Sequence, residues 1–135
     1  MSVKRNFDVN GFKVDFELDN GVCLFNYRSG HGVSYAFRLL QEYCRQHRIP
    51  CRLLDELTPP EDARKIIEKP DALYLLLDHA NCYLDPQWLL NVDYGKCRIL
   101  IHEHQPLGLF KLPLDKGMYN ITFDEDRLEI YPSIR

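Results

Sequence analysis

The feature that most constrains the fold is a change of hydrophobic period between residues 22 and 44. Residues 22–25 (Val-Cys-Leu-Phe) are continuously apolar, which is typical of a strand covered on both faces. From Val33 onward, apolar residues recur three and four positions apart with polar residues between them, which predicts an amphipathic helix over 33–47. A buried strand therefore turns into a helix through residues 28–32, which include two glycines.

The centre of the chain continues to alternate strands with helices. We expect a strand over 51–57, a helix from 58 to 69 that Pro59 and Pro60 start and Pro70 stops, a strand over 73–77, a short helix over 85–90 with Asp85 as its N-cap, and a strand over 98–102. Strands that alternate with helices form parallel sheets with right-handed crossovers. The centre of the chain is therefore predicted to be α/β.

Antiparallel hairpins are predicted at both ends. Residues 12–18 alternate apolar with polar, and the turn signal at 19–21 favours pairing with residues 22–27. Near the other end we expect strands over 109–112, 119–123 and 128–131, the last two joined by a turn at 124–126. The expected fold is one α/β domain over residues 1–135: a mainly parallel central sheet with helices on both faces and antiparallel hairpins at both ends.

Charge and cysteine usage narrow the function classes. The net charge of −3 does not suit a dedicated nucleic-acid-binding domain, because phosphate neutralisation needs a basic surface. The nearest approach to one is a set of four arginines that we interpret as a solvated helix face and its exit: Arg38, Arg45, Arg48 and Arg52. Five irregularly spaced cysteines, no membrane-length apolar run and no signal-peptide centre predict a cytoplasmic protein.

The strand-to-helix turn resembles the P-loop of nucleoside triphosphatases. A P-loop joins a strand to a helix, offers backbone N–H groups to phosphate, and carries a lysine followed by Ser or Thr. Against the Gly-x-Gly-Lys-Ser form of this motif, Gly30, Gly32 and Ser34 match, and Val33 stands at the lysine position.

A second segment is similar to the Walker B strand of the same enzymes. The apolar run 73–77 ends in Asp78, the residue type that associates with magnesium there, and His79 stands where a catalytic glutamate commonly follows. The order of the segments resembles the subgroup of ABC-type and AAA-type ATPases, in which one strand, here 51–57, separates the two motifs. The resemblance covers roughly residues 21–105.

This resemblance also implies a sheet order and a site. Strand 98–102 would insert between the two motif strands, with His102 or His104 at a sensor position. The implied cofactors are ATP or GTP with magnesium: Gly30, His31, Gly32 and Ser34 would hold phosphate, and Asp78 would position the metal. The structural alternative is that the glycines merely permit a tight turn.

The resemblance implies little or no catalysis. Without the lysine the γ-phosphate loses its main positive partner, and without the glutamate the attacking water loses its activator. The chain is also similar to small proteins of Firmicutes and their mobile elements that carry eroded ATPase domains, a similarity that assigns no function. We therefore expect weak or no nucleotide binding and a non-catalytic interaction or regulatory module, with a protein partner or as a homodimer.

Three alternatives come from other residues. His79, His102 and His104, with Cys82, form a candidate metal set. His102 and His104 share one face of a strand, His79-x-x-Cys82 has ligand-like spacing, and α/β sheets place ligands at this edge. The chain would then be a metal-binding protein or a hydrolase that uses the three histidines. A nucleophilic cysteine, Cys82 or Cys97, could pair with His102. Finally, the C-terminal hairpin could expose an edge strand that pairs with a partner protein.

Overall fold

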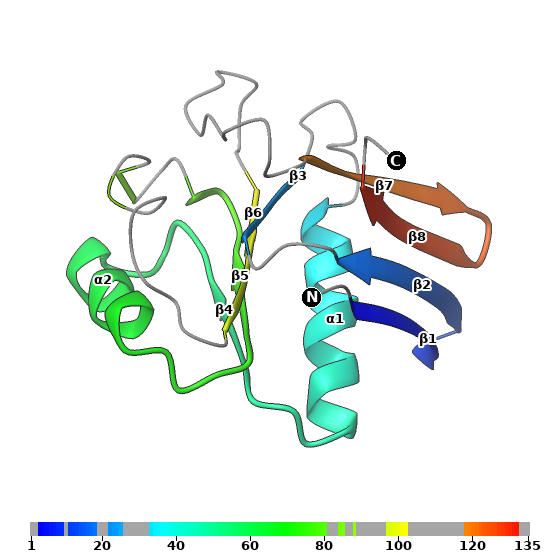
Figure 1. Cartoon of the computed structure of the whole chain (residues 1–135), viewed down its shortest axis with the longest axis horizontal. Coiled ribbons are helices and arrows are strands. Elements are labelled where there is room, and N and C mark those ends of the chain that lie inside the picture. Colours follow the sequence, from blue (N-terminus) through cyan, green and yellow to red (C-terminus); the bar gives the residue numbers. More distant parts are fainter. Residues whose placement is uncertain are drawn as a thin grey trace.

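The computed structural model describes residues 3–9, 11–18, 22–25, 33–80, 84–85, 88, 97–102 and 118–132. Its strands are β1 (Val3–Val9), β2 (Phe12–Leu18), β3 (Val22–Phe25), β4 (Cys51–Leu54), β5 (Tyr74–Leu77), β6 (Arg98–Ile101), β7 (Met118–Asp124) and β8 (Arg127–Pro132). Its helices are α1 (Val33–Gln46) and α2 (Pro60–Glu68). The strands form one mixed sheet in the order β1-β2-β8-β7-β3-β6-β5-β4, so the chain is a mixed α/β protein (Figure 1).

One part of this sheet is parallel throughout. β7, β3, β6, β5 and β4 follow one another, and each adjacent pair is parallel. The predicted insertion of strand 98–102 between the strand before the glycine-containing turn and the strand before Asp78 is confirmed. Because the strands are parallel, their carboxyl ends meet at one edge, where Asp78 and His102 follow β5 and β6.

The N-terminal hairpin differs from the prediction. β2 pairs with β1 and β8, and not with the strand over 22–25, so the expected pairing of residues 12–18 with 22–27 is wrong. Val9 pairs with Phe12, and Gly11 in the loop between them has φ +83°. Glycine adopts a positive φ at low cost, so Gly11 suits the turn of this hairpin.

The C-terminal hairpin is confirmed, but its expected exposure is wrong. β7 and β8 pair antiparallel around a turn at Glu125 and Asp126. β8 also pairs with β2, and β7 with β3, so both strands lie inside the sheet. Among the described strands the edges are β1 and β4. The expected strand at 109–112 lies outside the described residues.

The two described helices cover opposite faces of the sheet. Successive side chains of β5 and β6 point to alternate faces, so each strand contacts both helix layers. Leu76 and Leu100 pack in one buried cluster with the apolar face of α1. Their neighbours pack in a second buried cluster with Ala63 and Ile67 of α2: Leu75, Leu77, Ile99 and Ile101. Figure 1 shows α1 and α2 on either side of β4, β5 and β6.

The ends of both helices follow from local sequence. Pro60 opens α2 as its first residue, with Glu61 and Asp62 in the first turn, as predicted. At the end of α1, Arg48 has φ +56°, its N–H bonds the Arg45 carbonyl, and the Ile49 N–H bonds the Cys44 carbonyl. This is a Schellman motif, and it ends the helix just before Pro50.

The four arginines considered above are exposed, as expected for a solvated surface. Two of them lie beside carboxylates: Arg45 contacts Glu42, and Arg52 lies 3.5 Å from Asp71. Within the described part of the chain, neither helix has the length and apolar character that crossing a bilayer requires.

Candidate functional site

The site begins at the start of α1. Ser34, in the first turn, donates a hydrogen bond from Oγ to Oδ1 of Asp78 over 3.1 Å. Val33, which stands at the lysine position in the predicted resemblance to a P-loop, is completely buried in the core beneath α1. The sequence therefore brings the serine and the aspartate of the two motif-like segments together. Gly30, His31 and Gly32 lie outside the described residues.

Asp78 is fixed at the carboxyl end of β5. Its N–H bonds the carbonyl of Leu54 over 2.8 Å, and its side chain is nearly inaccessible, with the residue 5% exposed. Leu77 pairs with Ile101, so the residues that follow, Asp78 and His102, are neighbours at the sheet edge. His102 Nδ1 lies 2.7 Å from Asp78 Oδ1, and this side chain is also buried.

The hydrogen bonds to Asp78 decide its charge. Burial raises the pKa of the Asp78 carboxyl, because desolvation disfavours the ionised form. Hydrogen bonds from His102 and from Ser34 act in the other direction, and the net pKa of Asp78 lies below its usual value. Asp78 is thus a buried, ionised carboxylate at neutral pH, with two donors on one oxygen.

His79 faces Asp78 from the next position. It has φ +50°, an uncommon conformation for a residue other than glycine. Its Nδ1 lies 2.6 Å from Glu56 Oε2, and its Nε2 lies 3.7 Å from Asp78 Oδ1. The N–H of Ala80 bonds the His102 carbonyl over 2.8 Å, which holds this turn against the end of β6.

Glu56 is the member of the site that sequence reasoning missed. It follows β4, and β4 pairs in parallel with β5 so that Leu54 lies opposite Leu77. A hydrogen bond from its own backbone N–H, and then one from His79, lower the pKa of the Glu56 carboxyl. The sequence pattern predicted Glu56 inside a strand over 51–57, but β4 ends at Leu54. Its position just beyond β4 becomes informative only once the strand order is known.

Of the predicted metal-binding histidines, the structure describes His79 and His102. Their ring centroids are 5.4 Å apart, and Asp78 lies beside them. His104 lies outside the described residues. In Asp78, His79 and His102, one ligand atom from each residue lies within 4.8 Å of the other two.

The proposed Cys97–His102 pair is wrong. Cys97 precedes β6 and His102 follows it, so the two side chains lie at opposite ends of that strand. At roughly 3.3 Å per residue, their α-carbons stand about 16 Å apart, beyond reach of a proton transfer. Cys82, the other candidate nucleophile, lies outside the described residues.

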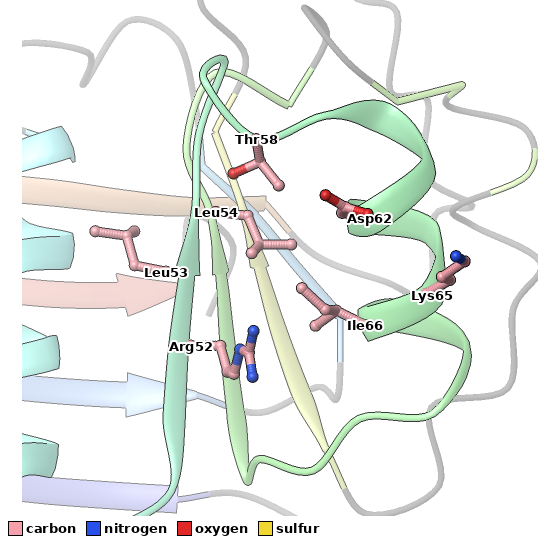
Figure 2. Close-up of a pocket in the computed structure, with 7 residues that line it drawn as sticks. All are labelled: Arg52, Leu53, Leu54, Thr58, Asp62, Lys65 and Ile66. Carbon is pink, nitrogen blue, oxygen red and sulfur yellow. The ribbon is translucent and has the colours of Figure 1, made fainter.

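A separate groove of about 540 Å³ lies between β4 and α2. Figure 2 shows its lining, with the polar groups contributed by Arg52, Thr58, Asp62 and Lys65. Ser34, Asp78, His79 and His102 do not line it. The groove is open to solvent and carries charges of both signs. It therefore serves as a comparison site for ligand binding at the Asp78 end of the sheet.

The described fold and site define a mixed α/β protein with a buried carboxylate, a hydroxyl and two imidazoles at the carboxyl edge of its parallel strands. No protein family, curated protein or solved structure matches the chain. Its function must therefore be argued from its own residues.

Proposed function

We propose that this chain is a degenerate P-loop-like domain that binds a magnesium nucleoside triphosphate weakly and does not hydrolyse it efficiently. The observation that carries the proposal is the hydrogen bond between Ser34 and Asp78. In the family that the sequence resembles, a serine or threonine at the start of the helix and an acid at the end of the second strand share one magnesium ion. Oxygen ligands of this kind suit that ion.

The strand order supports the same proposal. β6 lies between β3 and β5, and β4 lies beyond β5. This arrangement places the start of α1 and the end of β5 at the same sheet edge, where open α/β sheets bind their ligands. A helix start also offers backbone N–H groups and a partial positive charge to phosphate.

Two residues argue against efficient hydrolysis. Val33 is buried and apolar, so it offers no positive charge to the γ-phosphate. His79 stands at the position of the catalytic glutamate, and its Nδ1 is bound to Glu56. Each lost electrostatic contact of this kind commonly costs a few kcal/mol of transition-state stabilisation. We therefore expect binding without appreciable turnover.

A nucleotide-binding domain without catalysis acts through another protein. The described sheet has edges at β1 and β4, and edge strands pair readily with other chains. We infer that the partner, or a second copy of the chain, adds to one of these edges. Light scattering with and without nucleotide tests the homodimer, and a monomer in both conditions would exclude it.

Calorimetry with magnesium ATP and magnesium GTP tests nucleotide binding. We expect a Kd on the order of 0.1–1 mM, or about −5.5 to −4 kcal/mol. Ser34→Ala and Asp78→Asn should each weaken binding by about fivefold or more, since each removes a magnesium ligand. Thr58→Ala removes a hydroxyl in the β4–α2 loop and is the matched control. Absence of binding by the folded wild type at millimolar nucleotide would contradict the proposal.

A further inference from the structure

Two imidazole side chains lie beside the Asp78 carboxylate, and a magnesium site does not need such nitrogen ligands. Asp78, His79 and His102 offer one carboxylate oxygen and two imidazole nitrogens, all within 4.8 Å of one another. Imidazole and carboxylate together suit zinc and neighbouring transition metals, whereas magnesium prefers oxygen. We propose that these three residues bind one transition metal ion of the zinc class at the carboxyl ends of β5 and β6.

The distances fit such an ion with small side-chain movements. With metal–ligand bonds of about 2.0 Å, two ligand atoms of a tetrahedral site stand about 3.3 Å apart. Asp78 Oδ1 lies 2.7 Å from His102 Nδ1 and 3.7 Å from His79 Nε2. The second of these separations must narrow and the first must widen, each by less than an ångström, and the two imidazole nitrogens, which lie within 4.8 Å of each other, must approach to a similar distance. Coordination through His102 Nδ1 sends the proton of that nitrogen to Nε2 through solvent, so the ring stays neutral.

Glu56 prepares His79 for this role. Metal-binding histidines usually donate their other ring N–H to a carboxylate, which fixes the tautomer and the ring orientation. His79 Nδ1 lies 2.6 Å from Glu56 Oε2, and Nε2 is the nitrogen that faces Asp78. The positive φ of His79 turns the side chain into this arrangement. The segments that follow β4 and β5 therefore meet at the contact between Glu56 and His79.

Burial and access also fit a metal centre. The side chains of Asp78 and His102 are 7% and 8% exposed, so water competes little for them. The His79 side chain is 23% exposed and gives an ion a path from solvent. Three protein ligands leave a fourth position for water or a ligand atom, as in zinc sites that carry out chemistry.

This inference goes beyond the proposed nucleotide binding and can fail independently of it. Ser34 contacts Asp78 but is not among the three ligands. Ser34→Ala should therefore weaken nucleotide binding but keep all three zinc ligands, so that stoichiometric zinc binding persists with at most the loss of an outer hydrogen-bond partner. His79→Asn should weaken zinc binding. In magnesium buffer it should leave nucleotide binding unchanged, because an imidazole is not needed to hold magnesium or phosphate there.

Zinc titration of the tag-free, chelator-treated full chain tests the site. We expect one Zn²⁺ per chain with a Kd of about 1 μM or lower. Glu56→Gln should weaken binding by about 10–100-fold, and His79→Asn and His102→Asn by at least that much. His47→Asn is the matched control, because His47 is an exposed imidazole that lies tilted against Tyr43 at the far end of α1.

Cobalt substitution separates this site from a thiol site. Co²⁺ should give visible bands of a tetrahedral nitrogen and oxygen site, without the near-ultraviolet sulfur-to-cobalt charge transfer of a cysteine site. His79 is partly exposed, so His79→Asn should fold even if His102→Asn does not. Absence of stoichiometric zinc, a thiolate spectrum, or unchanged affinity in folded His79→Asn would overturn the proposal.

Discussion

Ser34 Oγ lies 3.1 Å from Asp78 Oδ1, although the two residues are 44 positions apart in the chain. The bond joins the first turn of α1 to the end of β5. It crosses β6, which lies between the strand preceding α1 and β5, and His102 at the end of β6 donates to the same oxygen. Asp78 therefore ties three segments together at one sheet edge.

Replacing Ser34 tests the structural value of this bond. Hydrogen bonds to charged groups contribute about 1.5–3 kcal/mol, so Ser34→Ala should lower the free energy of unfolding by that amount. Thr58→Ala removes a hydroxyl that accepts a hydrogen bond from the backbone N–H of Asp55 over 3.3 Å, and should cost about 1 kcal/mol or less. Urea denaturation measures both. Equal losses would mean that the Ser34 bond has no special strength.

Gly11 tests the N-terminal turn. Its φ of +83° suits glycine, and an added Cβ would meet nothing within 4 Å. Gly11→Ala should therefore destabilise the protein through backbone strain alone, by about 1–2 kcal/mol. Gly11→Asn should cost less, because asparagine tolerates this conformation. The same urea experiment checks both variants, and a neutral alanine would contradict the turn described here.

Two neighbouring isoleucines of α2 test the packing of that helix. Ile67 is completely buried against β5 and β6, whereas Ile66 is half-buried. Ile67→Ala should leave a cavity and cost about 2–5 kcal/mol. Ile66→Ala removes the same atoms from a partly solvated position and should cost clearly less. Thermal denaturation of the pair checks this order, and the reverse order would place the wrong face of α2 on the sheet.

The buried Cys97 thiol should lower the free energy of unfolding at high pH. Burial raises the pKa of its thiol from 9.0 to about 11. Below pH 9 the thiol is protonated in both states; between pH 9 and 11 it ionises in the unfolded chain first, which favours unfolding. Between pH 9 and pH 11 the free energy of unfolding of the wild type should therefore fall by on the order of 2 kcal/mol more than that of Cys97→Ala. Parallel pH profiles for the two proteins would contradict this.

Local sequence signals explain which elements could be predicted. The helical period after Val33 and the Pro59-Pro60 start gave both described helices to within two residues of their observed ends, because each signal is complete within one segment. β1 was missed because Arg5 interrupts its apolar alternation. The turn signal at 19–21 then suggested a pairing for residues 12–18 that the contacts of β2 with β1 and β8 replace.

Contacts between distant segments could not be predicted in the same way. The parallel pairing of β2 with β8 joins residues more than a hundred positions apart, and no local pattern encodes it. Ser34, Asp78 and His102 were found because each lies at an element boundary facing one edge. Glu56 reaches His79 only through the β4–β5 register.

Amide chemical-shift mapping with magnesium ATP tests the nucleotide proposal most directly, because it reports where the ligand binds. We expect the largest shifts on the first turn of α1 and on residues 78–80, and Ser34→Ala should diminish them. The groove at Arg52 and Lys65 carries positive charge and is the natural competitor. Shifts confined to that groove, or no shifts at millimolar nucleotide, would contradict the nucleotide proposal.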